Sequence, residues 1–393
     1  MKILLVNLKP FVNVQGGVEK VFCLMANNFV ERGYEVAFVG MDSQSGPPYF
    51  PISTKVNLHN IGNITVNKSL MHLIKRAFHF SKKKRHEFDS VAIAHSIALK
   101  LQNVFLQEKP DVTISFHIKD THILKKYMNI ECPVITMFHC IPTIYFKEIM
   151  FDEKIIRTTE KSDCLQVLLP SFIDDVRNYV KHENVIAIGN VVHQNKYMTS
   201  NHKGNIIINV GRVGKKDKRQ HLLIEAFNKI HTLYPDWRVE FWGDTSSEEQ
   251  YYEYCCNLID KYGLSDKVRF CGITSDIIEK LKQASIFAFP SAYEGFSLAL
   301  TEAMSLGLPC VGFKSCPSVN ELIRDGNNGI LCDDTVEGLA IGLTQLMDDV
   351  NKREKYGLQA KADMNKYAPE NIWRQWEELI NKTVIDYKLK YKD

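Results

Sequence analysis

The turn at residues 293–297 carries the strongest chemical signal in the chain. It follows an expected strand at 286–290 and leads into an expected helix, with Glu294 at its lip and Glu302 about two turns along. The first N–H groups of a helix have no intrahelical acceptor, and the helix dipole adds positive charge there. We therefore expect the backbone to bind an anion or a hydroxyl at this junction. The backbone groups concerned belong to Gly295, Phe296, Ser297 and Leu298.

The spacing of Glu294 and Glu302 is uninformative alone, because two other pairs repeat it and receive no function. These pairs are Glu240 with Glu248, and Glu370 with Glu378. The pair of Glu294 and Glu302 differs in its context: a strand, a turn and a helix surround it, and a Gly-Leu-Pro sequence ends that helix. With that context the segment resembles the signature of the retaining glycosyltransferases of family 4, also called group 1, which have the GT-B fold. The resemblance implies that one carboxylate contacts the hydroxyls of a donor sugar and the other the ribose of its nucleotide. The bland alternative is two solvated glutamates around a helix start.

A basic segment at 209–227 resembles the family's segment in which an Arg and a Lys bind the donor diphosphate. The matching residues are Arg212 and Lys218. Fixed cations suit this task, because negative charge builds up on the departing diphosphate. Many members have an Arg-to-Lys interval one residue shorter, so Lys215 and Lys216 stay open as alternatives. A solvated lysine-rich helix entrance would explain the same residues.

The first half of the chain supplies two further candidates. Gly16 and Gly17 join the first expected strand to the first helix, as the donor loop of the family does, and glycines allow backbone N–H groups to approach a phosphate or sugar. His139 follows an expected strand at 133–138, and the resemblance implies that it orients the donor sugar. His117, after the preceding strand, competes for this role, and a buried structural histidine is the alternative.

Gly272 and Ile273 match the place where family members hold the nucleotide base with main-chain groups. Side chains there do not distinguish the bases, although we favour a UDP-sugar. No Asp-x-Asp cluster lies at a strand end, so we expect no metal and no cofactor. Glu294 is then a binder and not a covalent nucleophile. The expected catalytic residues are His139, Arg212, Lys218 and Glu294.

The chain repeats one architecture twice. Short continuous apolar runs alternate with helical patterns, which is typical of a parallel sheet covered by helices on both faces. We expect two Rossmann-like doubly wound domains facing across a cleft, in an α/β fold of the GT-B class. The predicted boundaries are 1–195 for an acceptor domain, 196–370 for a donor domain and 371–393 for a C-terminal helix that packs back on the first domain.

Composition narrows the function classes. The chain has 49 basic and 46 acidic residues, a formal charge of +3, which excludes a protein devoted to binding nucleic acid. Ten cysteines without a Cys-x-x-Cys pair indicate reduced thiols. No apolar stretch reaches about 18 residues, so we expect a cytoplasmic protein. A basic amphipathic segment at 68–85 would suit contact with the inner leaflet of the membrane, or a helix packed in the core.

These observations predict transfer of a sugar from a nucleoside diphosphate to a hydroxyl of a glycan or lipid-linked acceptor. By analogy with the family, the setting is bacterial surface polysaccharide or lipopolysaccharide synthesis. The alternatives are a GT-B epimerase, a phosphorylase, or a non-catalytic protein that binds nucleotide sugars.

Overall fold

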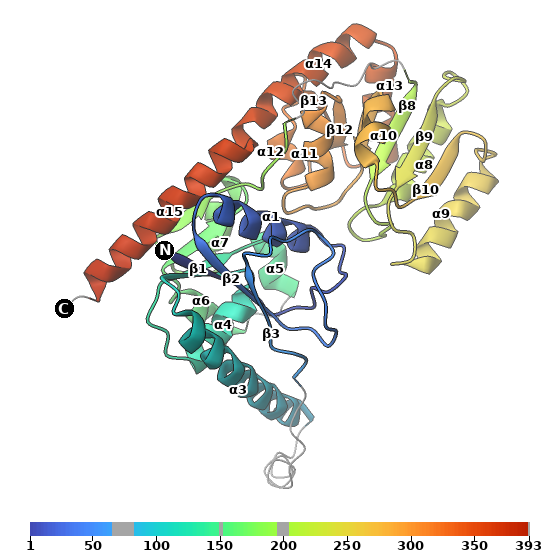
Figure 1. The fold of residues 1–393 in the computed structure, drawn as a ribbon. Helices are drawn as coiled ribbons and strands as arrows, with labels where there is room; N and C mark the ends of the chain where they lie inside the picture. Colours follow the sequence, from blue (N-terminus) through green and yellow to red (C-terminus); the bar gives the residue numbers. More distant parts are fainter. Residues whose placement is uncertain (65–81, 149–151, 195–203, 392–393) are drawn as a thin grey trace. The chain divides into compact units, whose positions relative to one another are not determined.

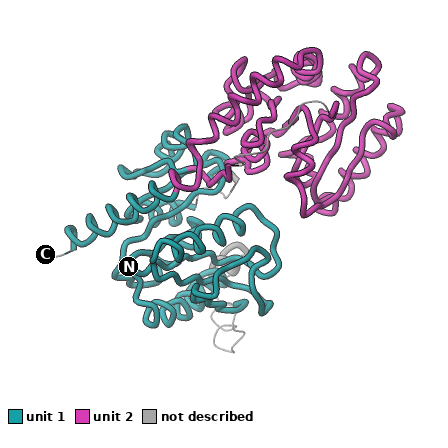
Figure 2. The backbone as a smooth tube through the Cα atoms, turned by 45° about the horizontal axis from the view of Figure 1, so that its top comes forward, with its two compact units in different colours: residues 1–188, 373–393 teal, residues 189–372 magenta. Residues whose placement is uncertain are grey.

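The computed structural model describes residues 1–64, 82–148, 152–194 and 204–391. The chain folds into two compact units, Met1–Ile188 with Trp373–Asp393, and Gly189–Ile372 (Figure 2). The chain changes unit after Ile188, seven residues before the predicted boundary at 195, and after Ile372, two residues beyond the predicted boundary at 370. The last helix, α15 (Pro369–Lys390), starts in the second unit and belongs to the first from Trp373 onward.

The described part of the first unit contains a seven-stranded parallel sheet in the order β3-β2-β1-β4-β5-β6-β7 (Figure 1). The strands are β1 (Lys2–Asn7), β2 (Glu35–Gly40), β3 (Asn57–Asn60), β4 (Val112–Ser115), β5 (Val134–Met137), β6 (Cys164–Val167) and β7 (Val185–Ala187). The helices described with them are α1 (Gly17–Glu31), α3 (Lys82–Glu108), α4 (Ile118–Tyr127), α5 (Pro142–Glu148), α6 (Glu153–Thr159) and α7 (Ser171–Arg177). The chain begins at a central strand, β1, and adds later strands outward on both sides, which is the arrangement of the predicted doubly wound sheet.

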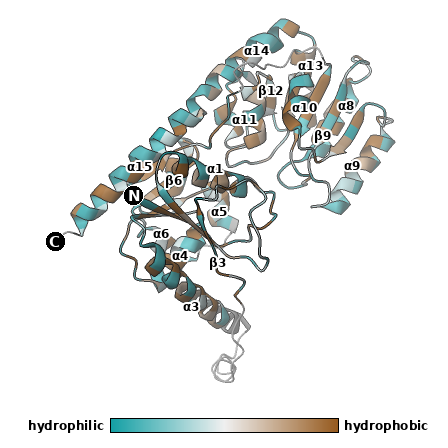
Figure 3. Ribbon diagram, in the orientation of Figure 1, coloured by the Kyte–Doolittle hydropathy of each residue, from teal (hydrophilic) through white to brown (hydrophobic). Residues whose placement is uncertain are grey.

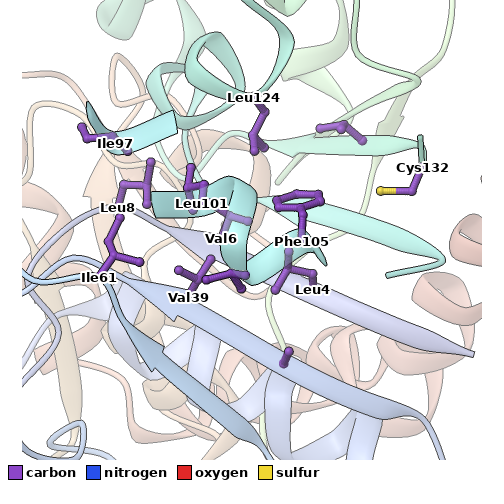
Figure 4. Packing of buried hydrophobic residues seen from close by; sticks show 13 residues of the cluster. Leu4, Val6, Leu8, Val39, Ile61, Ile97, Leu101, Phe105, Leu124 and Cys132 are labelled. Atoms are coloured by element: carbon purple, nitrogen blue, oxygen red, sulfur yellow. The ribbon is translucent and has the colours of Figure 1, made fainter. Parts of the chain in front are cut away.

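One face of this sheet packs against α3 and α4 (Figure 4). Leu4 and Val6 of β1 alternate toward this face and are fully buried, because successive side chains of a strand point to opposite sides. Leu101 and Phe105 of α3 and Leu124 of α4 complete the cluster. This core attaches α3 and α4 to strands β1, β2 and β5.

The C-terminal helix packs on α1 within the first unit. Arg32 Nη1 lies 2.6 Å from Glu377 Oε2, and the rings of Phe29 and Trp373 meet edge to face at 5.9 Å. Hydrophobic and hydrophilic residues alternate along α15 (Figure 3), and Trp376 on its buried side is 2% exposed. Apolar contact therefore attaches the end of the chain to its beginning.

The described part of the second unit contains a six-stranded parallel sheet in the order β10-β9-β8-β11-β12-β13. Its strands are β8 (Ile206–Val210), β9 (Arg238–Trp242), β10 (Val268–Gly272), β11 (Ile286–Phe289), β12 (Cys310–Phe313) and β13 (Gly329–Cys332). Its helices are α8 (Gln220–Ile230), α9 (Glu249–Lys261), α10 (Ile277–Gln283), α11 (Leu298–Ser305), α12 (Val319–Leu322), α13 (Val336–Met347) and α14 (Val350–Asp363), followed by the 3-10 helix η1 (Met364–Tyr367).

The predicted α/β class with two doubly wound parallel sheets is confirmed. Two strands were not predicted, β3 and β7: β3 carries mostly exposed side chains and so lacks an apolar run, and β7 is only 3 residues long. Most of the predicted amphipathic segment at 68–85 lies outside the described residues, and α3 begins at Lys82. None of the helices described is long and apolar enough to cross a membrane.

Candidate active site

Two loops of the second unit meet at the C-terminal edge of its sheet. The loop after β8 and the turn after β11 are joined by a hydrogen bond from the Ala292 N–H to the Asp217 carbonyl, at 2.7 Å. The loop after β9 approaches closely as well, because a Cβ at Gly243 would lie 2.2 Å from the carbonyl oxygen of Gly211. Both glycines have positive φ, +158° at Gly211 and +145° at Gly243. At Gly243 only a residue without a side chain allows this approach.

Lys218 and Glu294 form an ion pair across these loops. Their Nζ and Oε1 atoms lie 2.5 Å apart, and the side chains are 19% and 12% exposed. The ammonium also lies 5.7 Å from the ring centre of Phe289, at the end of β11. The structure thus brings together two residues that were predicted separately. The alternatives Lys215 and Lys216 are both exposed.

Arg212 lies in the same loop, and its side chain is 44% exposed. Its Nη2 atom is 2.5 Å from Asp217 Oδ2, and its Nη1 atom is 3.5 Å from Glu248 Oε1. The loop is held from below by Gln220, whose amide donates to the Arg212 carbonyl at 2.9 Å and accepts from the Gly214 N–H at 3.2 Å. A guanidinium held in this way presents donors to an anion in a fixed geometry.

The helix after the turn begins as predicted. Ser297 is the N-cap of α11, and its hydroxyl accepts a hydrogen bond from the Leu300 N–H at 3.2 Å. Phe296 is buried and meets the ring of Tyr367 edge to face at 5.0 Å, which anchors the turn. Gly295 is half-buried, and Glu302 lies half-buried in α11. The turn therefore presents its backbone at the start of a helix, the arrangement that favours an anion.

Gly272 and Ile273 lie at the same edge of the sheet. Gly272 ends β10 with φ of +73°, and its carbonyl accepts from the Gly243 N–H at 2.9 Å. Ile273 follows with 64% of its surface exposed. An exposed apolar side chain at this edge of the sheet suits the flat face of a base.

His139 follows β5 in the first unit, as predicted. It is half-buried, with its ring stacked on Phe116 at 5.2 Å and edge to face with His117 at 6.1 Å. Burial and the positive charge of Lys9 lower the pKa of His139 to about 3. Its Nε2 atom is buried and finds no hydrogen-bond partner among the described residues. His139 is therefore a neutral imidazole whose Nε2 atom has no hydrogen-bond partner among the described residues.

His117 shares these properties, so geometry alone does not separate the two candidates. Burial, Lys9 and His139 lower the pKa of His117 to about 3, and its Nε2 atom also has no partner within the described part of the chain. Both rings lie at the C-terminal edge of the first sheet.

Gly16 and Gly17 begin α1, with Gly16 as its N-cap. A Cβ at Gly16 would lie 1.9 Å from Oε2 of Glu19, so the carboxylate of Glu19 folds back over this glycine. An acid at the third helical position is the signal that predicts such a contact, and it was missed in the sequence. The open approach expected at Gly16 is therefore covered by the protein's own carboxylate in this conformation.

Comparison with known proteins agrees with the geometry of the second unit. Its residues match the family model described as glycosyl transferases group 1 over 194–363. Residues 194–363 belong to this family. An uncharacterized glycosyltransferase of Haemophilus influenzae is 25% identical over 375 residues, which cover 93% of this chain and 96% of the relative. The amylovoran biosynthesis glycosyltransferase AmsD of Erwinia amylovora is 23% identical over 382 residues, 94% of this chain and 97% of that protein.

Solved structures extend the likeness of fold over nearly the whole chain. HepE from Anabaena in complex with UDP has a TM-score of 0.75 and 18% identity, with 97% of this chain and 100% of that chain covered. At this identity the likeness shows the fold, which is GT-B as predicted.

Several contacts of the predicted site residues were not predicted from the sequence. Asp217 and Glu248 are the partners of Arg212, and their chain positions contain no pattern that would indicate this. Arg219 lies in the basic segment at 209–227 and was given no role there. Its Nε donates to the Pro290 carbonyl at 3.1 Å, and its Nη1 lies 2.9 Å from Asp334 Oδ1. Arg219 thus supports the turn after β11 from behind.

Other features of the chain lie away from these loops. Over the ranges described, no group of three His, Cys, Asp or Glu residues could hold a metal ion. None of the ten cysteines forms a disulfide. A cavity of about 680 Å³ in the first unit is lined by Pro110, Pro133 and Tyr387. Pro110 and Pro133 precede β4 and β5, so this cavity lies at the opposite edge of the sheet from His139.

Proposed function

We propose that this glycosyltransferase moves a sugar from a UDP-sugar, with retention at the anomeric carbon, to a hydroxyl of a glycan or lipid-linked acceptor. The observation that carries the proposal is the Lys218–Glu294 pair, which lies beside Arg212 and at the start of α11. These groups match three parts of the donor. The cation would bind the diphosphate, the carboxylate the sugar hydroxyls, and the helix start the leaving oxygen.

The donor diphosphate binds where the positive groups meet. Arg212 and Lys218 supply fixed charge, and the N–H groups of Gly295 to Ser297 supply backbone donors at the positive end of α11. On binding, the phosphate takes the Lys218 ammonium from Glu294, and the freed carboxylate accepts hydrogen bonds from the sugar. Glu302 holds the ribose, and Gly272 with Ile273 holds the base.

Transfer follows a front-face path. The bond between the anomeric carbon and the phosphate oxygen breaks while the acceptor oxygen bonds to the same face of the carbon. The acceptor proton passes to the departing phosphate oxygen, so no protein base is required. Arg212 and Lys218 stabilise the charge that develops on the diphosphate. His139, neutral because burial lowers its pKa to about 3, orients the sugar with its spare nitrogen.

These cations lead us to propose that the reaction needs no divalent metal and no cofactor. Two side-chain cations and a helix start supply the charge that a metal supplies in other transferases. The expected result is full activity in EDTA. Loss of activity in EDTA that returns with added Mg²⁺ or Mn²⁺ would contradict this part of the proposal.

The setting we propose is bacterial surface polysaccharide or lipopolysaccharide synthesis at the inner face of the cytoplasmic membrane. The similarity to AmsD, which is named for amylovoran biosynthesis, supports a polysaccharide product. The complex of HepE with UDP supports a uridine nucleotide. A lipid-linked acceptor would suit the basic segment at 68–85, whose lysines and arginines attract anionic lipid headgroups.

The test is a transfer assay with labelled UDP-sugars and lipid-linked glycans extracted from bacterial membranes. We expect a labelled product together with free UDP, and an anomeric proton coupling in the product that matches the donor. Glu294→Ala and Lys218→Ala should abolish transfer. Glu370→Ala is the matched control, because Glu370 is exposed and belongs to a pair with the same spacing.

Three outcomes would contradict the proposal. An inverted product would exclude the front-face path. Conversion of the donor sugar without release of UDP would indicate an epimerase. Binding of UDP-sugar with no turnover on any acceptor fraction would indicate a binding protein.

A further inference from the structure

Glu248 holds two donors of the loop after β8 at once. It lies just before α9, far along the chain from that loop, and its side chain is 37% exposed. Its Oε1 atom lies 3.5 Å from Arg212 Nη1, and its Oε2 atom accepts a hydrogen bond from the Lys215 N–H at 3.1 Å. One carboxylate thus binds a guanidinium and a backbone amide together.

These two donors form a small anion site. A guanidinium nitrogen and a backbone N–H that converge on two oxygens of one group are the contacts that bind a phosphate as well as a carboxylate. In the free protein the Glu248 carboxylate occupies this site. Its contact with Arg212 is long and open to solvent, so it is easily exchanged.

Asp217, the other carboxylate on Arg212, has the opposite character. Its Oδ2 atom lies 2.5 Å from Arg212 Nη2, and its side chain is only 13% exposed. Its backbone carbonyl is tied to the Ala292 N–H. Gly214 lies against this pair, since a Cβ there would come within 2.5 Å of Asp217 Oδ1 and 2.7 Å of Arg212 Nη1. Asp217 is thus built into the loop, whereas Glu248 is not.

We infer that Glu248 is a placeholder for a phosphate of the donor: its carboxylate occupies the Arg212 and Lys215 donors in the free enzyme and leaves when the diphosphate arrives. Asp217 remains on Arg212 throughout and is the positioning residue. This inference rests on the proposed function, which assigns the diphosphate to Arg212. It adds a residue that tunes donor affinity without contacting the reacting atoms.

The inference predicts that neutralising Glu248 and neutralising Asp217 change the affinity for the anion in opposite directions. Glu248→Gln keeps a side chain that can accept from the Lys215 N–H but removes the charge that competes with phosphate. Binding of an anion should then strengthen. Asp217→Asn removes the charge that orients the guanidinium, so binding of the same anion should weaken.

The experiment measures UDP affinity by isothermal titration calorimetry on the full-length protein. For Glu248→Gln we expect the Kd to fall about twofold to fivefold, the value of one exposed ion pair. For Asp217→Asn we expect it to rise at least about tenfold, as for a less exposed charged pair. Glu249→Gln is the matched control, since Glu249 is an exposed neighbouring acid of the same charge. The Kd of this variant for UDP should equal that of the wild type.

Two further readouts separate a placeholder from a structural acid. In an Arg212→Ala background, Glu248→Gln should no longer strengthen UDP binding, because the shared cation is gone. In steady-state assays Glu248→Gln should lower the donor KM and leave kcat unchanged. A purely structural role would instead raise KM and lower the melting temperature.

The failures are distinguishable. Wild-type protein that binds none of UDP, GDP and ADP overturns the proposed function and this inference with it. Wild-type protein that binds UDP while Glu248→Gln binds it equally or more weakly overturns the placeholder alone.

Discussion

The ion pair between Lys218 and Glu294 gives the sharpest prediction, because stability and activity should respond to it differently. The two side chains are 19% and 12% exposed, so the pair lies between a surface ion pair and a fully buried one. Exposed pairs contribute roughly 0–1 kcal/mol, and breaking a buried pair costs roughly 3–5 kcal/mol. We therefore expect Glu294→Ala or Lys218→Ala to lower the free energy of unfolding by about 2 kcal/mol.

The double variant, Lys218→Ala with Glu294→Ala, should lose less stability than either single variant. With both charges removed, no half-buried charge lacks a partner, and most of the lost stability should return. Activity should not return, because the diphosphate still lacks its cation. The variants therefore separate the role of the pair in folding from its role in donor binding.

The assay is differential scanning calorimetry beside the transfer assay. For a unit of this size, a change of about 2 kcal/mol corresponds to a shift of roughly 4–8 °C in the melting temperature. We expect that shift in each single variant and a smaller one in the double variant. Two results would refute the reasoning: single variants that melt like the wild type, or a double variant that transfers sugar at the wild-type rate.

Three further predictions concern residues around the site. Ser297→Ala removes the cap of α11 and should cost about 1 kcal/mol, measured as a lower melting temperature, whereas Ser297→Asp should keep the cap. Gly214→Ala places a methyl group against Asp217 and Arg212 and should raise the Kd for UDP in calorimetry, with no effect meaning that the ion pair is not needed. Burial lowers the pKa of His139 to about 3, so below about pH 6.5 only the unfolded chain protonates this ring and folding stability is lost as the pH falls. His139→Phe should therefore reduce the loss of urea resistance between pH 7 and pH 5, by about 1.4 kcal/mol per pH unit at most; an unchanged pH dependence would show that the ring titrates normally.

Local pattern was sufficient for most of the second unit. The strand predicted at 286–290 is β11 (Ile286–Phe289), and the helix predicted after the turn is α11 (Leu298–Ser305), because each of these elements buries one continuous surface. The turn at 293–297 was recognised for the same reason: a strand end, a glycine and a serine cap are all local signals. Ser297 is indeed the N-cap of α11.

Elements that bury no continuous apolar surface were not predicted. Strand β3 pairs with β2 through its backbone while its side chains are mostly exposed, so no apolar run marks it. The fold-back of Glu19 onto Gly16 was missed although its signal is local. The residue types at Gly16 and Gly17 indicated a helix start, but not which group would cover it.

The sequence by itself determined the two α/β units, the helix start at the site, and the acids and bases available for chemistry. Only the tertiary structure decided which of them meet. Lys218 finds Glu294 across 76 positions, and Glu248, dismissed on spacing, reaches the Lys215 N–H across 33. Periodicity reports which side of an element is buried, whereas a charge pair depends on which loops the strand order brings to the same edge of the sheet. That order is a property of the whole unit, and no short segment contains it.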